Sequence, residues 1–358
     1  MTPDFWAGRR VLVTGHTGFK GAWLTAWLDR MDAKVTGLSL APDVSPNLWE
    51  LLDLRARVSS VIGDLSNPAA LNKAFAGGPE VVVHLAAQSL VRESYNDPVG
   101  TFATNVTGTV ALLHKIAQTP SVRSVIVATS DKAYENPEHG RAFKEGDPYG
   151  GSDPYSASKG ACEIATAAMR RSFFAPGGAH PAGVASVRAG NVIGGGDWAR
   201  DRLVPDIVRG CLSGDGTVAL RAPGSVRPWQ HVLEPLRGYM TLAEHLYHDP
   251  ETYAAGWNFG PFREDERDVQ SVADAIVAAL GKGRIIHDID LSAPKESHVL
   301  RLDASRARDR LGWHPVLDFK RTTELTADWY ARWHAGGSPA EITAAQIQHY
   351  TDLLSETV

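Results

Sequence analysis

Three glycines near the start of the chain restrict its fold more than any other feature of the sequence. An apolar run over residues 11–14 leads into Gly15, Gly18 and Gly21, and a periodic apolar segment follows over residues 22–28. This order predicts a buried strand, a tight turn and a helix. The first glycine lets the chain turn, the second lets backbone N–H groups approach a phosphate, and the third lets the helix pack close to the strand.

The glycine pattern by itself also fits an ordinary turn between a strand and a helix. Its spacing is G-x-x-G-x-x-G, whereas most dinucleotide-binding folds carry G-x-G-x-x-G. Dinucleotide binding is favoured because the loop follows the first strand of a βαβ series. At that place a helix N-terminus presents free N–H groups and a partial positive charge to a pyrophosphate.

Strands and helices alternate over the first half of the chain and predict an α/β fold. We expect a Rossmann-type doubly wound parallel sheet over residues 1–188, as a dinucleotide-binding domain. After residue 190, glycine clusters and prolines replace the alternation, so we expect a smaller, mixed substrate domain over most of 189–358, with about 229–258 returning to the sheet. The further expected strands are 34–40, 58–62, 79–85, 124–128 and 184–187, and the long helices are 98–118 and 154–173.

Composition excludes several classes of protein. The 358 residues carry a formal net charge of −5, which argues against a nucleic-acid groove or binding to an anionic membrane surface. Two cysteines, Cys162 and Cys211, make a disulfide framework improbable. No apolar run has membrane-spanning length, and the N-terminus does not resemble a signal peptide. We therefore expect a cytoplasmic protein.

Other strand ends bear on the cofactor. The second expected strand ends in Leu38-Ser39-Leu40 rather than in the Asp or Glu that usually binds the adenine ribose, so this rule does not decide between NAD and NADP. Asp64 follows the third strand and could either meet the adenine edge or cap the next helix. His84 ends a strand of valines, which favours a structural role over catalysis.

Tyr155 and Lys159 form the strongest catalytic signal. They lie at i and i+4 on a helix expected to begin after Asp153, so both side chains point the same way. Tyrosine has a reference pKa of about 10, and a nearby ammonium together with an oxidised nicotinamide favours the phenolate. The phenolate can take a proton from an alcohol as hydride leaves its carbon, and Ser130, after the fifth strand, can hydrogen-bond the same alcohol. Tyr-x-x-x-Lys alone also fits a surface pair, and the upstream glycine loop argues against that interpretation.

With these residues in place, the chain resembles the extended short-chain dehydrogenase/reductase family over nearly its whole length. Within that family it is similar to the nucleotide-sugar 4,6-dehydratases, most closely those that act on CDP-glucose, through G15-H-T-G-F-K-G21, T129-S-D-K-A-Y134, R188-A-G-N-V-I-G-G-G-D-W198 and R227-P-W-Q-H231. The resemblance implies NAD as a retained cofactor. It places the following residues at NAD: Gly15, Thr17, Gly18, Phe19, Lys20, Gly21, Asp64, Leu65, Leu85, Ala86, Ala87, Asn105, Thr129, Tyr155, Lys159 and Ala189.

The resemblance also implies a dehydration without net redox change. Tyr155 takes the C4 hydroxyl proton, hydride moves from C4 to NAD, water leaves across C5 and C6, and the hydride returns to C6. Asp131 is expected to protonate the C6 hydroxyl if burial raises its pKa. Lys132 replaces the glutamate that related dehydratases use at C5, a departure that the CDP-glucose enzymes share. It could be the C5 base if its pKa is depressed, or it could orient Asp131 or stabilise the enolate.

The resemblance further implies a nucleotide-sugar substrate, CDP-glucose, and a homodimer or dimer of dimers formed through the two long helices. Arginines suit a diphosphate because their guanidinium donates two parallel hydrogen bonds. No metal is expected. The expected substrate-binding residues are Gln88, Ser130, Asn191, Arg202, Arg227 and His231.

Two alternatives stay open. One is another nucleotide-sugar dehydratase, epimerase or reductase of the same fold, and the other is a non-catalytic dinucleotide-sensing protein. The Asp131-Lys132 pair argues against an epimerase, which needs no acid to expel a C6 hydroxyl. The intact set of Ser130, Tyr155 and Lys159 argues against a sensor.

Overall fold

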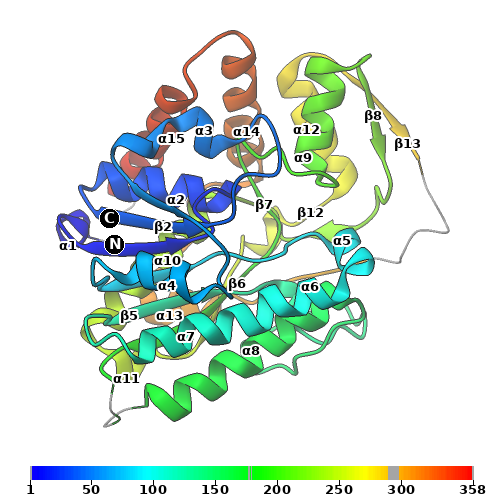
Figure 1. Ribbon diagram of the computed structural model, residues 1–358. Coiled ribbons are helices and arrows are strands. Elements are labelled where there is room, and N and C mark those ends of the chain that lie inside the picture. Colours follow the sequence, from blue (N-terminus) through cyan, green and yellow to red (C-terminus); the bar gives the residue numbers. More distant parts are fainter. Residues whose placement is uncertain (1, 176–177, 179, 289–297, 357–358) are drawn as a thin grey trace.

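A parallel seven-stranded sheet forms the centre of the computed structural model, which describes residues 2–175, 178, 180–288 and 298–356 (Figure 1). The strand order is β11-β6-β5-β4-β1-β2-β3. The chain reverses its direction of travel across the sheet between β1 and β4, and in folds of this kind ligands bind outside the carboxyl ends of the strands at such a reversal. The strands are β1 (Arg10–Thr14), β2 (Lys34–Ser39), β3 (Ser59–Ile62), β4 (Val81–His84), β5 (Ser124–Ala128), β6 (Gly183–Ala189) and β11 (Gly256–Phe259).

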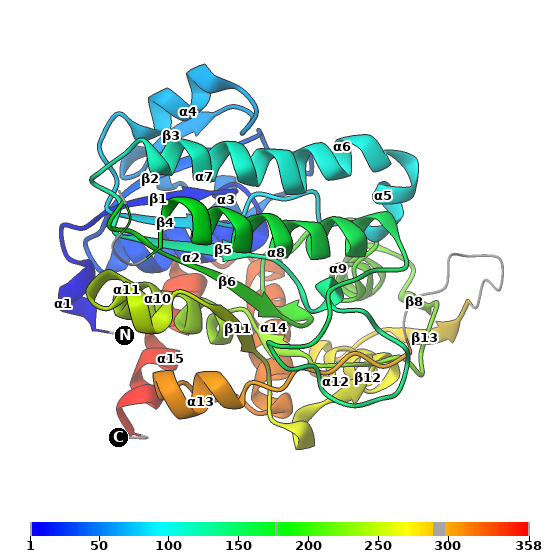
Figure 2. The same ribbon diagram turned by 90° about the horizontal axis from the view of Figure 1, so that it is seen from below.

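Helices cover both faces of the sheet because its strands are apolar on both sides. Along β1, Val11 and Val13 join the core on one face and Leu12 joins the core on the other. Figure 2 shows α4 (Pro68–Phe75), α7 (Thr109–Ala117) and α8 (Pro154–Phe173) on one side, with α2 (Phe19–Arg30) and α10 (Leu233–His248) on the other. The predicted Rossmann-type doubly wound fold is thereby confirmed.

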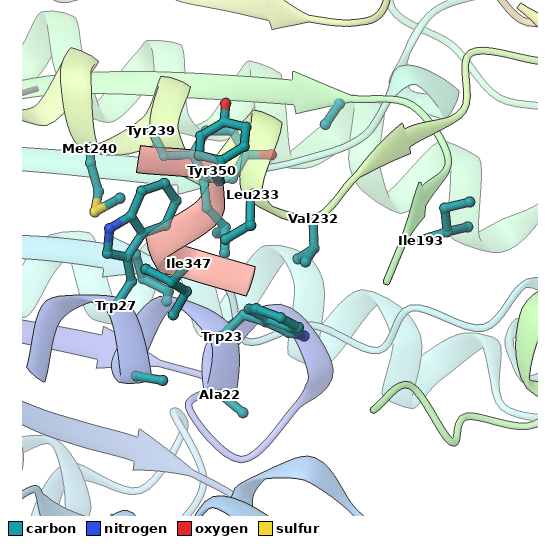
Figure 3. Packing of buried hydrophobic residues seen from close by; sticks show 14 of the residues in the cluster. Ala22, Trp23, Trp27, Ile193, Val232, Leu233, Tyr239, Met240, Ile347 and Tyr350 are labelled. Atoms are coloured by element: carbon teal, nitrogen blue, oxygen red, sulfur yellow. The ribbon is translucent and has the colours of Figure 1, made fainter. Parts of the chain in front are cut away.

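The C-terminal helix α15 (Pro339–Glu356) packs against α2, although the two are far apart in sequence. In Figure 3, Ile347 and Tyr350 of this helix lie beside Trp27. The rings of Trp27 and Tyr350 meet edge to face, with centroids 5.6 Å apart, and an aromatic side chain removes roughly 150–250 Å² from water on burial. The last helix therefore stabilises the half of the molecule that carries the glycine loop.

A smaller group of elements stands beside the carboxyl ends of the main sheet, drawn mostly in green and yellow in Figure 1. Three two-stranded pairs and several short helices build it. It includes β7 (Val192–Ile193), α9 (Leu203–Val208), β8 (Thr217–Leu220), β9 (Val226–Arg227), β10 (Gln230–His231), β12 (Arg267–Asp268), α12 (Val269–Leu280) and β13 (Arg284–His287).

The expected strands over 34–40, 58–62 and 79–85 are one to three residues shorter in the structure, and two other expected elements differ in ways that bear on the site. The helix expected over 98–118 contains a π-helical segment, η2 (Ala103–Gly108), between α6 (Pro98–Phe102) and α7. The strand expected over 184–187 runs on to Ala189, so the expected boundary at residue 188 falls within β6. The remaining helices are α1 (Pro3–Trp6), α3 (Leu48–Leu52), α5 (Val91–Asn96), α11 (Pro250–Tyr253), α13 (Ser305–Leu311) and α14 (Phe319–His334). Over the described residues, none of the helices is long and apolar enough to cross a membrane.

Candidate active site

The glycine loop between β1 and α2 has the geometry that a dinucleotide pyrophosphate needs. Gly15 has a φ of +76°, and a Cβ at this position would come within 2.7 Å of the Ala86 nitrogen. A Cβ on Gly21 would come within 2.0 Å of the Gly15 oxygen, so the third glycine packs against the loop itself rather than only against the strand. Gly18 precedes α2 without a side-chain cap, which leaves N–H groups for an anion.

At the end of β2, Thr17 of the glycine loop forms hydrogen bonds with the polar groups of residues 39 and 40. The Thr17 hydroxyl lies 2.7 Å from Ser39 Oγ and donates to the Leu40 oxygen at 2.9 Å. Asp64 accepts a hydrogen bond from the Ser66 nitrogen at 2.7 Å. The cap of α4 is Asn67, so the alternative that Asp64 caps this helix is wrong.

Asn105 organises the loop that follows β4. Its side chain accepts from the Gln88 nitrogen and donates to the Gln88 oxygen and to Ser158 Oγ, each at 2.9 Å. Asn105 lies in the π-helical segment η2, a rare local geometry that is frequent at functional sites. The Gln88 amide is engaged within its own loop, where it donates to Thr101 Oγ1 at 2.9 Å. Asn105 thus joins the loop beyond Leu85, Ala86 and Ala87 to helix α8.

His84 is buried and hydrogen-bonded on both ring nitrogens. Nδ1 lies 2.6 Å from Thr14 Oγ1, and Nε2 lies 2.9 Å from Thr109 Oγ1. Burial, with a smaller contribution from Lys159, lowers its pKa to about 3. A neutral histidine that ties β4 to β1 and α7 agrees with the expected structural role.

The turn after β5 brings together Ser130, Asp131 and Lys132. Ser130 Oγ donates to Asp131 Oδ1 at 3.0 Å, and the Lys132 nitrogen donates to the same oxygen at 2.9 Å. Asp131 Oδ2 is buried and has no hydrogen-bond partner in the structure. Burial raises the pKa of Asp131, against the opposing charge of Lys132. Asp131 therefore holds its proton to higher pH than an exposed aspartic acid does, as a general acid requires.

Tyr155 and Lys159 project from the first turns of α8, which begins at Pro154 as predicted. Asp153 caps the helix by accepting from the Ser156 nitrogen at 2.9 Å. Burial raises the pKa of Tyr155 to about 12, and a hydrogen bond with Ser130 opposes this rise. Even with Lys159 nearby, the Tyr155 phenol therefore keeps its proton well above neutral pH. The phenolate expected in catalysis also requires the positive charge of the oxidised nicotinamide.

Several cations surround this centre. Burial and the charge of Arg202 lower the pKa of Lys20, in the glycine loop, to about 8, whereas the charge of Asp131 raises it. Arg202 donates to Asp197 at 3.2 Å and to Ser89 Oγ at 2.8 Å. Arg227 is 4% exposed and its charge lowers the pKa of Asp131. The glycine loop, the catalytic carboxyl and two substrate-binding candidates thus share one charged cluster.

One expected substrate-binding residue, His231, is fully buried. His231 is 0% exposed, its ring lies against Trp23 with centroids 5.9 Å apart, and burial lowers its pKa to about 3. The structure therefore gives His231 a packing position in the interior, which does not support the expected contact with substrate. Ala189 ends β6, and Asn191 follows it, accepting through its backbone oxygen from the Gln230 nitrogen at 3.0 Å.

Sequence reasoning missed two residues beneath the catalytic groups, Glu163 and Arg188. They form a fully buried ion pair at 2.7 Å. The sequence held two signals: Glu163 continues the i, i+4 series of Tyr155 and Lys159 along one helix face, and Arg188 is a charged residue in a strand that has no other charge.

Comparisons with known proteins agree with this geometry. Residues 11–256 match the model of the NAD dependent epimerase/dehydratase family. The chain is 45% identical to the CDP-glucose 4,6-dehydratase of Salmonella typhimurium over 97% of both chains. It is 28% identical to a dTDP-glucose 4,6-dehydratase of Xanthomonas campestris, with 89% of this chain and 92% of the relative covered.

Solved structures share the fold. A dTDP-glucose 4,6-dehydratase from Bacillus anthracis in complex with NAD superposes with a TM-score of 0.76 at 22% identity, covering 93% of this chain and 99% of that one. The UDP-glucose 4-epimerase of Thermus thermophilus, also in complex with NAD, gives a TM-score of 0.75 at 25% identity, covering 90% and 98%.

Proposed function

Because the chain belongs to the NAD-dependent epimerase/dehydratase family, we propose that it is a CDP-glucose 4,6-dehydratase, a hydro-lyase that forms CDP-4-dehydro-6-deoxyglucose and water. The observation that carries this proposal is the 45% identity to the Salmonella CDP-glucose 4,6-dehydratase over 97% of both chains. The buried carboxyl of Asp131 beside Ser130 and Tyr155 supports it, because dehydration needs an acid to expel the C6 hydroxyl.

NAD fits the glycine loop, where a Cβ on Gly15 or Gly21 would clash and the α2 N-terminus lacks a side-chain cap. The α2 N–H groups would hold its pyrophosphate, and Tyr155 and Lys159 would face its nicotinamide end. When bound, it supplies the hydride acceptor for C4 and the hydride donor for C6, so that the overall reaction has no net redox change.

The chain's own residues move the protons. Tyr155 Oη takes the proton of the C4 hydroxyl, and Asp131 gives a proton to the departing C6 oxygen. After one turnover Tyr155 holds one proton more and Asp131 one proton fewer than before. Ser130 hydrogen-bonds with both side chains, so its hydroxyl offers a path for the proton to return from Tyr155 to Asp131.

Lys132 stands where related dehydratases carry the glutamate that acts at C5. Its backbone nitrogen holds Asp131 Oδ1, and its charge acts on that carboxyl. We assign it either removal of the C5 proton or stabilisation of the enolate that forms when this proton leaves. In a Lys132→Ala variant, solvent exchange at C5 that proceeds near the wild-type rate would exclude Lys132 as the base.

Arg202 and Arg227 are assigned to the diphosphate of the substrate, since both carry their charge beside the catalytic centre. We also assign a homodimer built on α6 and α8. Val99 on α6 is 79% exposed and Ile164 on α8 is 60% exposed, and the two helices pack side by side. Large apolar side chains exposed together on neighbouring helices are typical of an interface.

The test is an incubation in deuterated water with NAD and, separately, CDP-glucose, dTDP-glucose, UDP-glucose and GDP-mannose, followed by proton NMR. We expect a 6-deoxy-4-keto sugar with deuterium at C5 from CDP-glucose alone. A product that keeps its C6 hydroxyl would favour an epimerase or reductase, and no product from any donor would favour a sensor.

The Tyr155→Phe variant tests whether Tyr155 is the base that takes the C4 hydroxyl proton. We expect turnover to be lost while NAD binding, measured by calorimetry, stays within a few-fold of wild type, because only the proton-accepting oxygen is removed. Unchanged turnover would remove Tyr155 from the mechanism.

A further inference from the structure

The ion pair between Glu163 and Arg188 joins two parts of the catalytic centre. Each side chain is 1% exposed. Arg188 Nε donates to Glu163 Oε1 and Arg188 Nη2 donates to Oε2, both at 2.7 Å, which is the bidentate geometry of a strong charge-assisted pair. Thr129 Oγ1 also donates to Glu163 Oε1. One carboxylate thus receives three hydrogen bonds in the interior.

The location of this carboxylate links it to catalysis. Glu163 lies one helical turn beyond Lys159 on α8, so the two side chains share a helix face. Thr129 directly precedes Ser130 and Asp131, and its nitrogen donates to the Val187 oxygen at 2.9 Å. Glu163 therefore contacts the chain on which the acid stands and adjoins the lysine beside the base.

Arg188 extends the contact to the segment that follows the catalytic turn. Its Nη1 donates to Tyr134 Oη at 2.8 Å, and its Nη2 donates to Tyr149 Oη at 2.6 Å. These two tyrosines stand at either end of the polar loop over residues 135–148. The guanidinium therefore holds Glu163 from one side and both ends of this loop from the other.

Stability alone does not require charges at these positions. A buried ion pair loses so much hydration that apolar residues of similar volume often give equal or greater stability. The effect of the carboxylate on its neighbours therefore explains a negative charge at Glu163 better than stability does.

Lys159 is the neighbour that needs this charge. Burial lowers the pKa of the Lys159 ammonium, and Cys162 and then the charge of Glu163 oppose that fall. Lys20 repels the ammonium from α2, and His84 on β4 is held neutral. Among the described titratable groups around Lys159, Glu163 is the carboxylate. These groups are Tyr155, Cys162 and Glu163 on α8, Lys20 on α2 and His84 on β4.

We propose that Glu163 is a positioning residue for the dehydration: its carboxylate places a negative charge on the helix face of Lys159 and fixes Thr129 beside the acid, while Arg188 holds the carboxylate in place. The inference rests on the proposed function for its role in turnover. The charge state of Lys159 does not depend on which sugar is the substrate, so it is tested separately.

The decisive measurement is a carbon NMR titration of full-length enzyme labelled at the lysine Cε, with Lys159→Met identifying the Lys159 resonance. Glu163→Gln keeps the shape of the side chain and removes its charge. Loss of a nearby opposite charge shifts a pKa by about one unit or more. We expect the Lys159 midpoint to move to lower pH by at least about one unit.

Glu163→Gln leaves Arg188 buried without its partner and could unfold the chain. The double variant Glu163→Gln/Arg188→Gln removes both charges and avoids this problem. It should shift the Lys159 midpoint in the same direction but by less, because the positive charge of Arg188, which opposes that of Glu163, is removed as well. Glu163→Asp keeps the charge on a shorter side chain, so the Lys159 midpoint should stay near wild type. A matched control is Glu234→Gln, which changes a buried glutamate bound by Tyr350 and by the Val316 and Leu317 nitrogens; it should leave Lys159 unchanged.

Activity gives the second readout. With CDP-glucose as substrate, the alkaline limb of kcat/KM should move to lower pH in both Glu163→Gln variants, because Lys159 loses its proton earlier. A merely structural role would lower kcat/KM equally at all pH values. A folded variant whose Lys159 midpoint stays at the wild-type value overturns the proposal. Absence of wild-type turnover of CDP-glucose would overturn the proposed function and leave the NMR result to decide the role of Glu163.

Discussion

At the residue scale, Asp131 combines burial with an incomplete set of hydrogen bonds. Burial raises its pKa, so its ionised form opposes folding: a raised folded pKa gives stability that is complete below the unfolded value and is lost as pH rises through the folded value. We predict that Asp131→Asn raises the free energy of unfolding at pH 8 by about 1 kcal/mol, a gain often found when a strained site residue is neutralised. Turnover should fall by about 10²–10⁴-fold because the general acid is lost.

Urea denaturation at pH 8 and pH 4 measures this effect, and the gain should shrink at pH 4, where nearly half of the Asp131 carboxyls in the unfolded wild-type chain are also protonated. Asp147→Asn is the matched control. The hydrogen bond from Arg141 lowers the pKa of Asp147, so the same substitution there should not stabilise the protein. An Asp131→Asn variant that is less stable than wild type at pH 8 would contradict the assigned burial.

Residues whose role follows from local spacing could be predicted from the sequence, and residues whose role follows from packing could not. Tyr155 and Lys159 share a helix face by their spacing alone. His231 stands in a stretch that resembles a family motif, yet its side chain turns inward against Trp23, and only the packing of α2 against β10 decides this. The role of Glu163 can be inferred only from its ion pair with Arg188, which lies on strand β6, distant in the sequence.

At the element scale, the start of α8 sets the position of Tyr155. Asp153 accepts from the Ser156 nitrogen at 2.9 Å and from Ser156 Oγ at 2.6 Å. We predict that Asp153→Ala lowers the free energy of unfolding by about 1 kcal/mol, the usual effect of removing an N-cap. It should also lower kcat more than it raises KM, because fraying of the first turn moves the base away from the reacting oxygen.

Asp318→Ala is a matched control for this prediction, since Asp318 caps α14 by accepting from the Arg321 nitrogen at 2.7 Å. It should cost similar stability in urea denaturation and leave kcat unchanged. Equal losses of kcat in both variants would mean that the cap acts through global stability alone.

The elements themselves were predictable where one local signal decides them. The Asp153-Pro154 start of α8 is a cap followed by a residue suited to the first turn, and the structure begins the helix there. The π-helical segment around Asn105 was not predictable, because its sequence fits an α-helix. The extra residue per turn aligns Asn105 with both Gln88 and Ser158, which are tertiary partners.

At the scale of the whole molecule, three buried histidines make the free energy of unfolding fall as the pH falls below about 6.5. Burial lowers the pKa of His16 to about 4, and those of His84 and His231 to about 3. The unfolded chain binds a proton at each of them near pH 6.5. Folded pKa values below the unfolded value give stability that is complete above pH 6.5 and is lost as pH falls toward the folded values.

Each such histidine should contribute a slope of about 1.4 kcal/mol per pH unit near pH 5. We predict that His231→Leu removes one share of this slope. Nε2 of His231 has no hydrogen-bond partner to lose, and Nδ1 loses the bond from the Leu233 nitrogen at 3.4 Å, which changes stability at every pH but not the slope. Urea denaturation at pH 7, 6 and 5 measures the slope, and taking the difference from wild type cancels the opposing effects of Asp131 and Glu234, whose pKa values burial raises. His114→Gln, at an exposed position on α7, should leave the slope unchanged. If His231→Leu also keeps the wild-type slope, His231 titrates freely in the folded protein and lies open to solvent, where it could meet a substrate after all.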